Sequence, residues 1–407
     1  MKCRNCQKKL NFKWIDLGNS PPSNNYIKKK DFKKKEKKFP LKVYVCKKCW
    51  LAQTWDYARA EDLFKKDYAY FSSTSKTFLK HAKDYTDKII KKLKLNNKSK
   101  VIEIASNDGY LLKNFKKKNI PCIGIEPTID TANFAEKLGI KVIKSFFNSK
   151  LAKNLTKDQN NADLIIGNNV YAHVPDICDF TKGIEILLKE NGTVTLEFPH
   201  LLKLIKYKQF DTVYHEHFSY LSLSVVKNIF QKNNLKIYNV EEIKTHGGSL
   251  RVYGCKKKAK FSCNRNVKKI LDQEISFGLK KIDTYKKFQK KIDAVKYEFL
   301  KFLNNEKNKN KKICGYGAAA KGNTLLNYCN IKNNIIDFIC DASPYKQNMK
   351  LPGSKIPIYS PYKIKEKKPD YIIILPWNLS KEIQNQLSYI KKWNGKFVTV
   401  IPKLKIL

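Results

Sequence analysis

Short apolar runs alternate with amphipathic stretches between residues 100 and 200, and this alternation predicts strands and helices in turn. Runs of Ile, Val and Leu that are bounded by polar turns are typical of buried strands. The expected strands are residues 101–104, 122–126, a run ending before Phe146, 164–167 and 193–198, and the expected helices are residues 77–95 and 110–118. The pattern therefore predicts an α/β fold with a doubly wound parallel sheet.

A second region of the same kind follows a long lysine-rich stretch. Residues 268–305 have the spacing of one helix or of a helix pair. A new α/β unit opens at residue 312, and apolar runs at 335–340, 371–375 and 397–401 predict its further strands. We expect three domains: a small N-terminal module (1–72), a central α/β domain (73–262), and a helical connector with a Rossmann-like α/β domain (263–407).

Two cysteine pairs with short spacing frame the N-terminal module. The pairs are Cys3–Cys6 and Cys46–Cys49, and 39 residues separate one pair from the other. Four thiolates suit tetrahedral zinc, and a small module with few core residues gains folding energy from such a site. The alternatives are four unliganded thiols and a catalytic zinc, but a catalytic zinc would need the open position that Cys-only sites lack. We expect the four cysteines to form a structural zinc site.

The turn after the first strand of the central domain is the expected cofactor site. It reads Ser-Asn-Asp-Gly, with one glycine and an acid, unlike the Gly-rich turns that hold a pyrophosphate. Glu126 ends the second strand, 23 residues after Glu103, where an acid typically binds ribose hydroxyls. These features favour a cationic, amino-acid-like cofactor such as S-adenosylmethionine (SAM). The expected cofactor contacts are Glu103, Ala105, Ser106, Asn107, Asp108, Gly109, Glu126 and Asn168.

Polar residues with catalytic potential cluster after the fourth strand. Five of the six histidines lie between residues 173 and 246. Asn168, Asn169 and His173 follow the fourth strand, and ligands of open α/β sheets bind at the carboxyl ends of strands. Histidine suits a general base near neutral pH, and Asn, Tyr and His can donate hydrogen bonds to a developing oxyanion.

The motif Tyr214-His-Glu-His217 adds candidates for the same pocket. In an extended segment, Tyr214 and Glu216 would share one face, and His215 and His217 would share the other. A turn would bring all four round one pocket. Metal binding by His215, Glu216 and His217 is the rival interpretation. For the two other histidines of the cluster, His200 and His246, we favour a structural role.

A glycine-rich turn opens the C-terminal unit. Gly315, Gly317 and Ala320 match the dinucleotide-binding pattern G-x-G-x-x-A, and Asp341 follows 21 residues after Ala320. This turn could hold NAD or another diphosphate, with Lys321 adding a positive charge. The alternative is that the glycines serve only close packing of strand and helix. An NAD-dependent oxidoreductase or epimerase is one function that such a turn would support.

The formal charge of +46 suggests nucleic acid at first sight, but the composition argues against that partner. The 82 basic residues include only four arginines, which are Arg4, Arg59, Arg251 and Arg265. Arginine is preferred for bidentate phosphate and guanine contacts. No apolar run reaches the roughly 18–20 residues of a membrane span, and the N-terminus lacks an apolar signal region. We expect a cytoplasmic protein without nucleic-acid or membrane partners and without disulfides.

Together these motifs resemble the nucleotide-sugar C-methyltransferases. The resemblance rests on the two cysteine pairs and on the stretches Asp-Tyr-Ala-Tyr-Phe-Ser-Ser-Thr-Ser, Glu-Ile-Ala-Ser-Asn-Asp-Gly-Tyr-Leu-Leu, Asn-Asn-Val-Tyr-Ala-His-Val-Pro-Asp, Phe-Asp-Thr-Val-Tyr-His-Glu-His and Gly-Tyr-Gly-Ala-Ala-Ala-Lys-Gly-Asn-Thr. It implies a zinc module, a class I SAM methyltransferase domain, and a Rossmann-like domain that helps to hold the nucleotide sugar. It also implies SAM-dependent methylation of C-3 in a dTDP-linked 4-keto-6-deoxy sugar.

The resemblance assigns roles to individual residues. It implies that His217 is the general base that forms an enolate, with Tyr214 and Glu216 as its active-site partners. Asn169 and His173 match residues that line the sugar, and Tyr68 matches a tyrosine that reaches in from the N-terminal side. The expected contacts to the nucleotide sugar are Gly315, Gly317, Lys321 and Asn323. We expect the protein to be a monomer.

Overall fold

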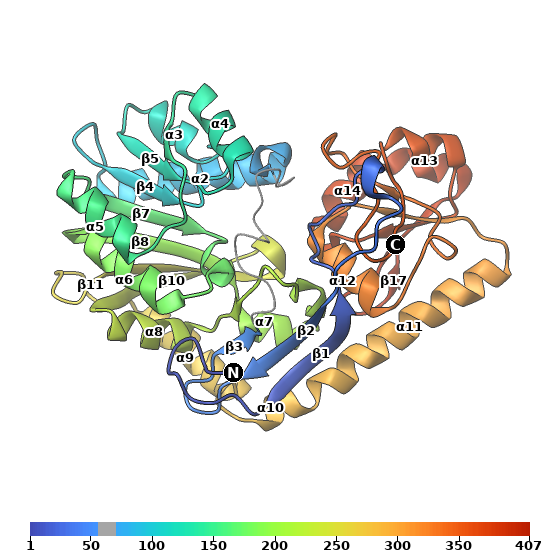
Figure 1. Cartoon of the computed structure of the whole chain (residues 1–407), viewed down its shortest axis with the longest axis horizontal. Helices are drawn as coiled ribbons and strands as arrows, with labels where there is room; N and C mark the ends of the chain where they lie inside the picture. The colour runs from blue at the N-terminus through green and yellow to red at the C-terminus, as the bar shows by residue number, and fades with distance from the viewer. Residues whose placement is uncertain (56–70) are drawn as a thin grey trace.

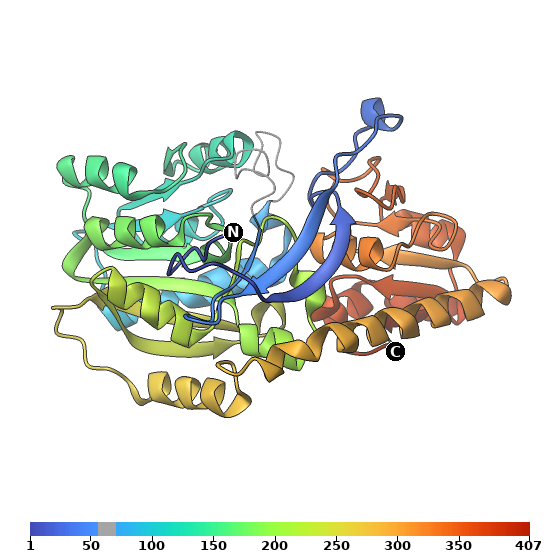
Figure 2. The ribbon, with the colours of Figure 1, turned by 60° about the horizontal axis from the view of Figure 1, so that its bottom comes forward.

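The computed structural model describes residues 1–55 and 71–407, which form three β-sheets with helices around them (Figure 1). A central unit and a C-terminal unit each contain one sheet and lie side by side. The N-terminal sheet and the long helix α11 (Phe288–Asn308) run from one unit to the other. Figure 2 shows the N-terminal ribbon crossing between the two units. No helix in the described part of the chain is long and apolar enough to cross a membrane.

The central unit holds a seven-stranded sheet in the order β10-β11-β8-β7-β4-β5-β6. Strands β4 to β8 are parallel, and β11 and β10 are antiparallel additions at one edge. The strands are β4 (Val101–Ile104), β5 (Cys122–Ile125), β6 (Lys141–Ile143), β7 (Ala162–Asn168), β8 (Leu188–Pro199), β10 (Leu235–Ile243) and β11 (Ser249–Lys256). The five strands expected from the apolar runs are confirmed, whereas the β10–β11 hairpin was not expected.

Helices cover both faces of this sheet (Figure 1). They are α2 (Lys76–Leu93), α3 (Leu112–Lys116), α4 (Ile129–Lys137), α5 (Ser149–Lys157), α6 (Ile177–Leu187), α7 (Leu201–Lys206) and α8 (Leu223–Lys232), with 3-10 turns η3 (Tyr171–His173), η4 (Phe210–Thr212) and η5 (Thr245–Gly247). Polar caps start several of them. Ser75 accepts a hydrogen bond from Phe78 N at the start of α2, and Ser222 accepts one from Val225 N at the start of α8.

The C-terminal unit holds a six-stranded sheet in the order β14-β13-β12-β15-β16-β17. Its strands are β12 (Ile313–Tyr316), β13 (Ile339–Cys340), β14 (Ile358–Tyr359), β15 (Tyr371–Ile374), β16 (Lys396–Thr399) and β17 (Lys405–Ile406). The helices are α9 (Arg265–Phe277), α10 (Asp283–Lys286) and α11 in the connector, then α12 (Ala320–Tyr328), α13 (Tyr362–Lys367) and α14 (Ser380–Gln386), with 3-10 turns η6 (Trp377–Leu379) and η7 (Ser388–Trp393). The Rossmann-like α/β unit is confirmed, and three helices lie where we expected one helix or a helix pair.

The N-terminal sheet is completed by a strand from the central unit. Its order is β1 (Lys13–Ser20), β2 (Phe39–Val45), β3 (Ala52–Thr54) and β9 (Ser219–Tyr220), and all pairs are antiparallel. The short turns η1 (Lys29–Asp31) and η2 (Ser72–Thr74) belong to neighbouring loops. Because β9 closely follows the Tyr214–His217 motif, pairing of β9 with β3 fixes that motif against the N-terminal module.

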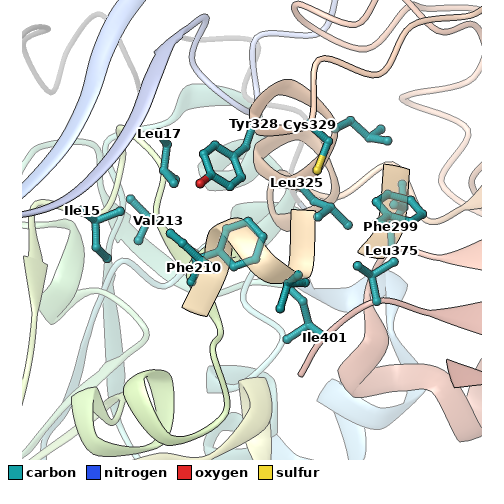
Figure 3. Close-up of a cluster of buried hydrophobic side chains, with 14 of the residues drawn as sticks. Ile15, Leu17, Phe210, Val213, Phe299, Leu325, Tyr328, Cys329, Leu375 and Ile401 are labelled. Atoms are coloured by element: carbon teal, nitrogen blue, oxygen red, sulfur yellow. The ribbon is translucent and has the colours of Figure 1, made fainter. Parts of the chain in front are cut away.

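The loop between β1 and β2, which comprises residues 21–38, forms an arm that reaches the C-terminal unit. Ile27 forms a β-bridge with Lys350, and Tyr26 Oη donates a 2.6 Å hydrogen bond to the Ala318 carbonyl in the glycine-rich turn. Figure 3 shows a buried core shared by all three units, with Ile15 and Leu17 from β1, Phe210 and Val213 from the central unit, and Phe299, Leu325, Tyr328, Cys329, Leu375 and Ile401 from the C-terminal unit. The three units therefore pack as one body.

Candidate active site and zinc module

The two cysteine pairs have the same local geometry. Each pair is followed by a residue with positive φ, Gln7 at 59° and Trp50 at 63°. The backbone N–H of Gln7 donates to the Cys3 carbonyl at 2.9 Å, and that of Trp50 donates to the Cys46 carbonyl at 2.8 Å. Each tight turn thereby points both cysteine side chains of its pair in one direction.

The four sulfur atoms fit one metal ion. All four Sγ atoms lie within 4.8 Å of one another, and the closest pairs, Cys3–Cys49 and Cys6–Cys46, are 3.4 Å apart. A tetrahedron with Zn–S bonds of about 2.3 Å has edges of roughly 3.8 Å, so the sulfur positions suit zinc. This is the only group of three or more candidate metal ligands among the described residues. In that part of the chain, His215, Glu216 and His217 do not form one.

The cofactor turn after β4 is held in an unusual backbone conformation. Ala105, Asn107 and Gly109 have φ values of 57°, 50° and 74°. A Cβ atom at Gly109 would lie 2.6 Å from Ile140 Cδ1, so this position requires glycine. The turn can therefore pack closely against the segment that precedes β6, at the carboxyl end of β4.

Glu126, at the end of β5, braces this turn. One carboxylate oxygen accepts a hydrogen bond from Asn107 N at 2.9 Å, and the other accepts one from Thr128 N at 2.8 Å. Burial raises the pKa of Glu126, although these hydrogen bonds lower it. Each carboxylate oxygen can accept more than one hydrogen bond, so Glu126 can also accept from ribose hydroxyls.

Buried acceptors without a partner gather near the cofactor turn. Both carboxylate oxygens of Glu103, Asp108 Oδ1 and Asn168 Oδ1 have no hydrogen-bond partner among the described residues. Burial, together with the neighbouring acids, raises the pKa of Glu103 well above its usual value. Buried acceptors need a donor or a cation. The ammonium group of an amino-acid-like cofactor would supply one, so the residues present fit SAM.

The Tyr214–His217 motif forms a turn in which the His217 N–H donates to the Tyr214 carbonyl at 2.9 Å. The turn brings the first and last residues together, with ring centroids 3.9 Å apart. His217 Nδ1 lies 2.7 Å from the Thr212 carbonyl. A carbonyl only accepts, so Nδ1 carries the proton and Nε2 keeps the lone pair that a base needs.

The surroundings of His217 favour its neutral form. His217 is 7% exposed, and burial lowers its pKa well below the usual value. The positive charges that His173, His246 and Lys321 can carry lower it further, while the Thr212 carbonyl opposes this effect. The centre of the His173 ring lies 4.5 Å from that of the His217 ring, and burial lowers the pKa of His173 to about 4. The structure thus places two neutral imidazoles side by side.

Asn169 precedes His173 on the same segment. It has a φ of 56°, and its backbone N–H donates to the Glu197 carbonyl at 2.8 Å. Its side-chain Oδ1 is buried without a hydrogen-bond partner among the described residues. Asn168 and Asn169 therefore both lie at the carboxyl end of β7, while Tyr68 lies outside the described residues.

Glu216 and His215, in the middle of the turn, have partners in the N-terminal module. Asn24 Nδ2 donates to Glu216 Oε1 at 3.2 Å, and burial raises the pKa of Glu216 to about 7. His215 Nε2 lies 3.3 Å from the Phe39 carbonyl. His215 and Glu216 are therefore each held by the N-terminal module, whereas the Thr212 carbonyl orients His217.

Close packing explains why glycine is needed at two positions of the C-terminal turn. A Cβ atom at Gly315 would lie 2.3 Å from Ile339 Cδ1, and one at Gly317, where φ is 89°, would lie 2.4 Å from Pro376 Cδ. Asp341 accepts backbone N–H groups from Ala318 at 2.7 Å and from Ser343 at 2.8 Å. Both carboxylate oxygens of Asp341 thus already brace the chain, as those of Glu126 do.

Lys321 faces the central unit. Its Nζ donates to the His246 carbonyl at 3.3 Å and lies 4.9 Å from the centre of the Trp377 ring. Burial lowers the pKa of Lys321, and Asp211 opposes this effect. Asn323, by contrast, is fully buried and donates from Nδ2 to the Ser23 carbonyl at 2.6 Å. Lys321 therefore lies at the interface near His217, while Asn323 is held by the arm.

Several residues around the site were not expected from sequence. Asp211 accepts a 2.7 Å hydrogen bond from Trp377 Nε1 and links the central and C-terminal units. It lies in the same Phe-Asp-Thr-Val-Tyr-His-Glu-His motif as His217, so the motif was a signal that could have identified it. Asn24 gave no comparable signal, because its partner Glu216 is 192 residues away in sequence.

The sixth histidine, His81, contacts a carboxylate on strand β8 of the central sheet. His81 on α2 lies 3.0 Å from Glu197 at the end of β8, and Arg251 Nε donates to the same carboxylate at 2.6 Å. Burial alone would raise the pKa of Glu197, but the His81 hydrogen bond and the Arg251 charge lower it below its usual value. This cluster fastens α2 to the sheet.

Three family models match successive parts of the chain. Residues 3–64 match a putative zinc binding domain, residues 78–240 match a methyltransferase domain, and residues 244–402 match a C-methyltransferase C-terminal domain. The chain is also 30% identical to the C-methyltransferase NovU of Streptomyces niveus, over 97% of this chain and 94% of that protein.

Solved structures also match this chain, each over less than half of its length. The PH0226 protein of Pyrococcus horikoshii OT3 is 14% identical, with a TM-score of 0.38 over 46% of this chain and 95% of its own. A SAM-dependent methyltransferase of Clostridium acetobutylicum ATCC 824 is 12% identical, with a TM-score of 0.35 over 44% of this chain and 91% of its own.

Proposed function

Because the chain belongs to the SAM-dependent C-methyltransferases, we propose that it methylates C-3 of a nucleotide-linked 4-keto-6-deoxy sugar. Its N-terminal module binds zinc and its central domain uses SAM. When bound, SAM supplies an electrophilic methyl group. Transfer to carbon requires a carbon nucleophile, and a 4-keto group acidifies the neighbouring C-3 proton so that a base can form an enolate.

His217 is the proposed base, and the hydrogen bond between Nδ1 and the Thr212 carbonyl is the observation that carries the proposal. It fixes the tautomer in which Nε2 can accept the C-3 proton. Burial keeps the imidazole neutral, and the His173 ring connects it to the end of β7, where the proposed cofactor contact Asn168 lies. Tyr214, with its ring against that of His217, would fix the base from the other side.

The developing enolate oxygen needs hydrogen-bond donors or a positive charge. We propose His173 and Asn169 for this role, because both follow β7 and the His173 ring contacts the His217 ring. Tyr68 remains a proposed contact from the N-terminal side. Glu216 would bind a sugar hydroxyl through Oε2, which is buried and has no hydrogen-bond partner among the described residues.

We propose that Gly315, Gly317 and Lys321 contact the diphosphate of the nucleotide sugar, with Asn323 in support. Lys321 lies in the first turn of α12, which follows the glycine-rich turn, and its ammonium group donates to the His246 carbonyl of the central unit. We propose that no NAD binds at this turn, because SAM already supplies the cofactor of the methyl transfer. We also propose a cytoplasmic, monomeric enzyme with domain boundaries near residues 72 and 262.

A substrate panel tests the proposed function. Zinc-loaded protein would be incubated with SAM and with nucleotide-linked 4-keto and reduced 4-hydroxy sugars, and the products analysed by mass spectrometry. We expect the 4-keto sugars alone to gain one methyl group, and NMR should locate it on C-3. Methylation of the 4-hydroxy sugars at an equal rate would refute enolate chemistry.

A further inference from the structure

The segment 71–78, which leads into α2, contacts the cofactor turn on one side and the C-terminal unit on the other. On the cofactor side, Ser72 N donates to Asn107 Oδ1 at 2.9 Å, and Ser73 N donates to Asp108 Oδ2 at 3.0 Å. Both acceptors belong to the SAM turn. The side chains of that turn are therefore oriented by two backbone N–H groups of a separate segment.

The C-terminal contacts of this segment come from aromatic and polar side chains. The Phe71 ring stacks on the Tyr345 ring, with centroids 4.7 Å apart and planes inclined by 16°. Phe71 also meets Phe134 of α4 edge-on at 6.1 Å. Thr77 Oγ1 donates a hydrogen bond to Glu382 of α14. Helix α4 follows β5 in the central unit, and Tyr345 follows β13 in the C-terminal unit. Phe71 therefore contacts both α/β units.

We propose that Tyr345 is a positioning residue for the cofactor: by stacking on Phe71 it holds segment 71–78 where Ser72 and Ser73 order the SAM turn. Tyr345 belongs to the C-terminal unit and meets the segment through the Phe71 ring. Cofactor binding and the seating of the C-terminal unit against α2 then favour each other, because each needs the same ordered segment. This inference concerns the cofactor alone and holds whichever sugar is methylated.

The geometry explains why an aromatic ring is needed at this position. Tyr345 is 49% exposed, so little of its side chain serves a core of its own. Offset-stacked rings attract each other beyond the area that they bury. Segment 71–78 begins with a short 3-10 turn, whose hydrogen bonds to the SAM turn anchor it on one side. A stacked partner from the C-terminal unit anchors the other side.

The test is calorimetric titration of SAM into the full-length, zinc-loaded protein. Tyr345→Ala should weaken SAM affinity about three- to tenfold, the range that one aromatic pair supplies. Tyr345→Phe should restore it. In the Tyr345→Ala background, Phe71→Leu should cause little further loss, because the pair is already broken. Tyr362→Ala removes a 71% exposed tyrosine of the same unit and serves as the matched control.

Hydrogen exchange gives a second readout that a merely structural role would not move. In the wild type, SAM should slow amide exchange in the peptide that contains Tyr345, and this protection should disappear in Phe71→Leu. The inference is wrong if folded Tyr345→Ala, with an unchanged melting temperature, binds SAM within twofold of the wild type. Equal loss of affinity in Tyr362→Ala would also overturn it.

Discussion

The imidazole of His217 is held by a backbone carbonyl and not by a carboxylate. A carboxylate partner would raise the basicity of the ring and would make proton release slower, whereas a neutral carbonyl fixes the tautomer with a smaller effect on the pKa. The proposed base would therefore act through position and burial. Substitution tests its position, and the pH dependence of the reaction tests its burial.

His217→Ala should lower kcat by about 10²–10⁴, the usual share of a general base, because the nitrogen that accepts the proton is removed. Exchange of the C-3 proton of the sugar with deuterated water, followed by NMR, isolates this step. His215→Ala alters the neighbouring histidine, which faces Phe39, and should retain the exchange. Exchange at the wild-type rate in His217→Ala would assign the base elsewhere.

The pH dependence of kcat/KM should reflect the depressed pKa of His217. The base must be unprotonated, and burial places its pKa well below the usual value of about 6.5. Activity is therefore fully present above about pH 6.5 and is lost only as the pH falls through the lower, folded value. Measurement of kcat/KM from about pH 5 to 8 checks this sign, and an acidic limb centred at or above about 6.5 would contradict it.

Glu126 is proposed to combine two tasks in one side chain. Its oxygens hold Asn107 N and Thr128 N, and we propose that they also bind ribose. Glu126→Ala should weaken SAM binding more than about tenfold, or roughly 1.4 kcal/mol. Glu126→Gln keeps one acceptor and should lose less. Calorimetric titration measures both, and an unchanged affinity in Glu126→Ala would remove Glu126 from the cofactor site.

At the scale of elements, the two cysteine turns act as one unit with β2 and β3. The second pair lies between these strands, and β3 carries β9 and thereby the Tyr214–His217 turn. Loss of the metal should therefore loosen a strand pair that ends at the proposed active site. We expect an indirect effect on chemistry, since the four cysteines and the Tyr214–His217 turn share no residue.

Cys46→Ser should remove zinc and destabilise the N-terminal module by a few kcal/mol, because binding free energy of a structural metal is folding free energy. Elemental analysis and thermal unfolding, with and without a chelator, check this result. Cys178→Ser changes a half-buried cysteine outside the set and should keep one zinc per chain. A zinc-free wild type, purified without chelator, would refute the site.

The elements that sequence predicted well are those whose signal is local. Strands β4, β5 and β7 consist of buried Ile, Val and Leu runs between polar turns, so the apolar pattern located them within a few residues. Strand β9 is two residues long and pairs with a strand more than 160 residues earlier, which leaves no local pattern. The Thr212 carbonyl could not be predicted either, because any residue supplies a carbonyl and only the turn brings it to His217.

At the scale of the whole molecule, the proposed active site lies where the units meet. Lys321 from α12 reaches the His246 carbonyl, and Asp211 receives the Trp377 indole from the other side. Sequence identified the two halves of this site separately, through the Tyr-His-Glu-His and Gly-x-Gly motifs. It could not show that they face each other, because that depends on packing of the shared core.

Lys321→Ala should raise KM for the nucleotide sugar about tenfold or more, through loss of one charge-assisted contact, while SAM affinity stays within twofold. Steady-state kinetics and calorimetry separate the two effects. Lys332→Ala removes another partly buried lysine of the same unit, which donates to the Gly353 carbonyl, and is the matched control. An unchanged KM in Lys321→Ala would exclude the diphosphate contact. Stoichiometric NAD in the purified protein would show that the turn binds a dinucleotide instead.

The arm between β1 and β2 has a consequence for biosynthesis. Glu36 accepts a hydrogen bond from Gly353 N, which is 317 residues later in the chain. At roughly 5–20 residues per second, a ribosome needs about 16–63 s to make that stretch. During this time the arm of a nascent chain lacks its C-terminal partner. The N-terminal sheet likewise remains incomplete until β9 has been made and pairs with β3. The arm is thus made long before its partners, so chaperones that bind exposed strands should find this protein early in its synthesis.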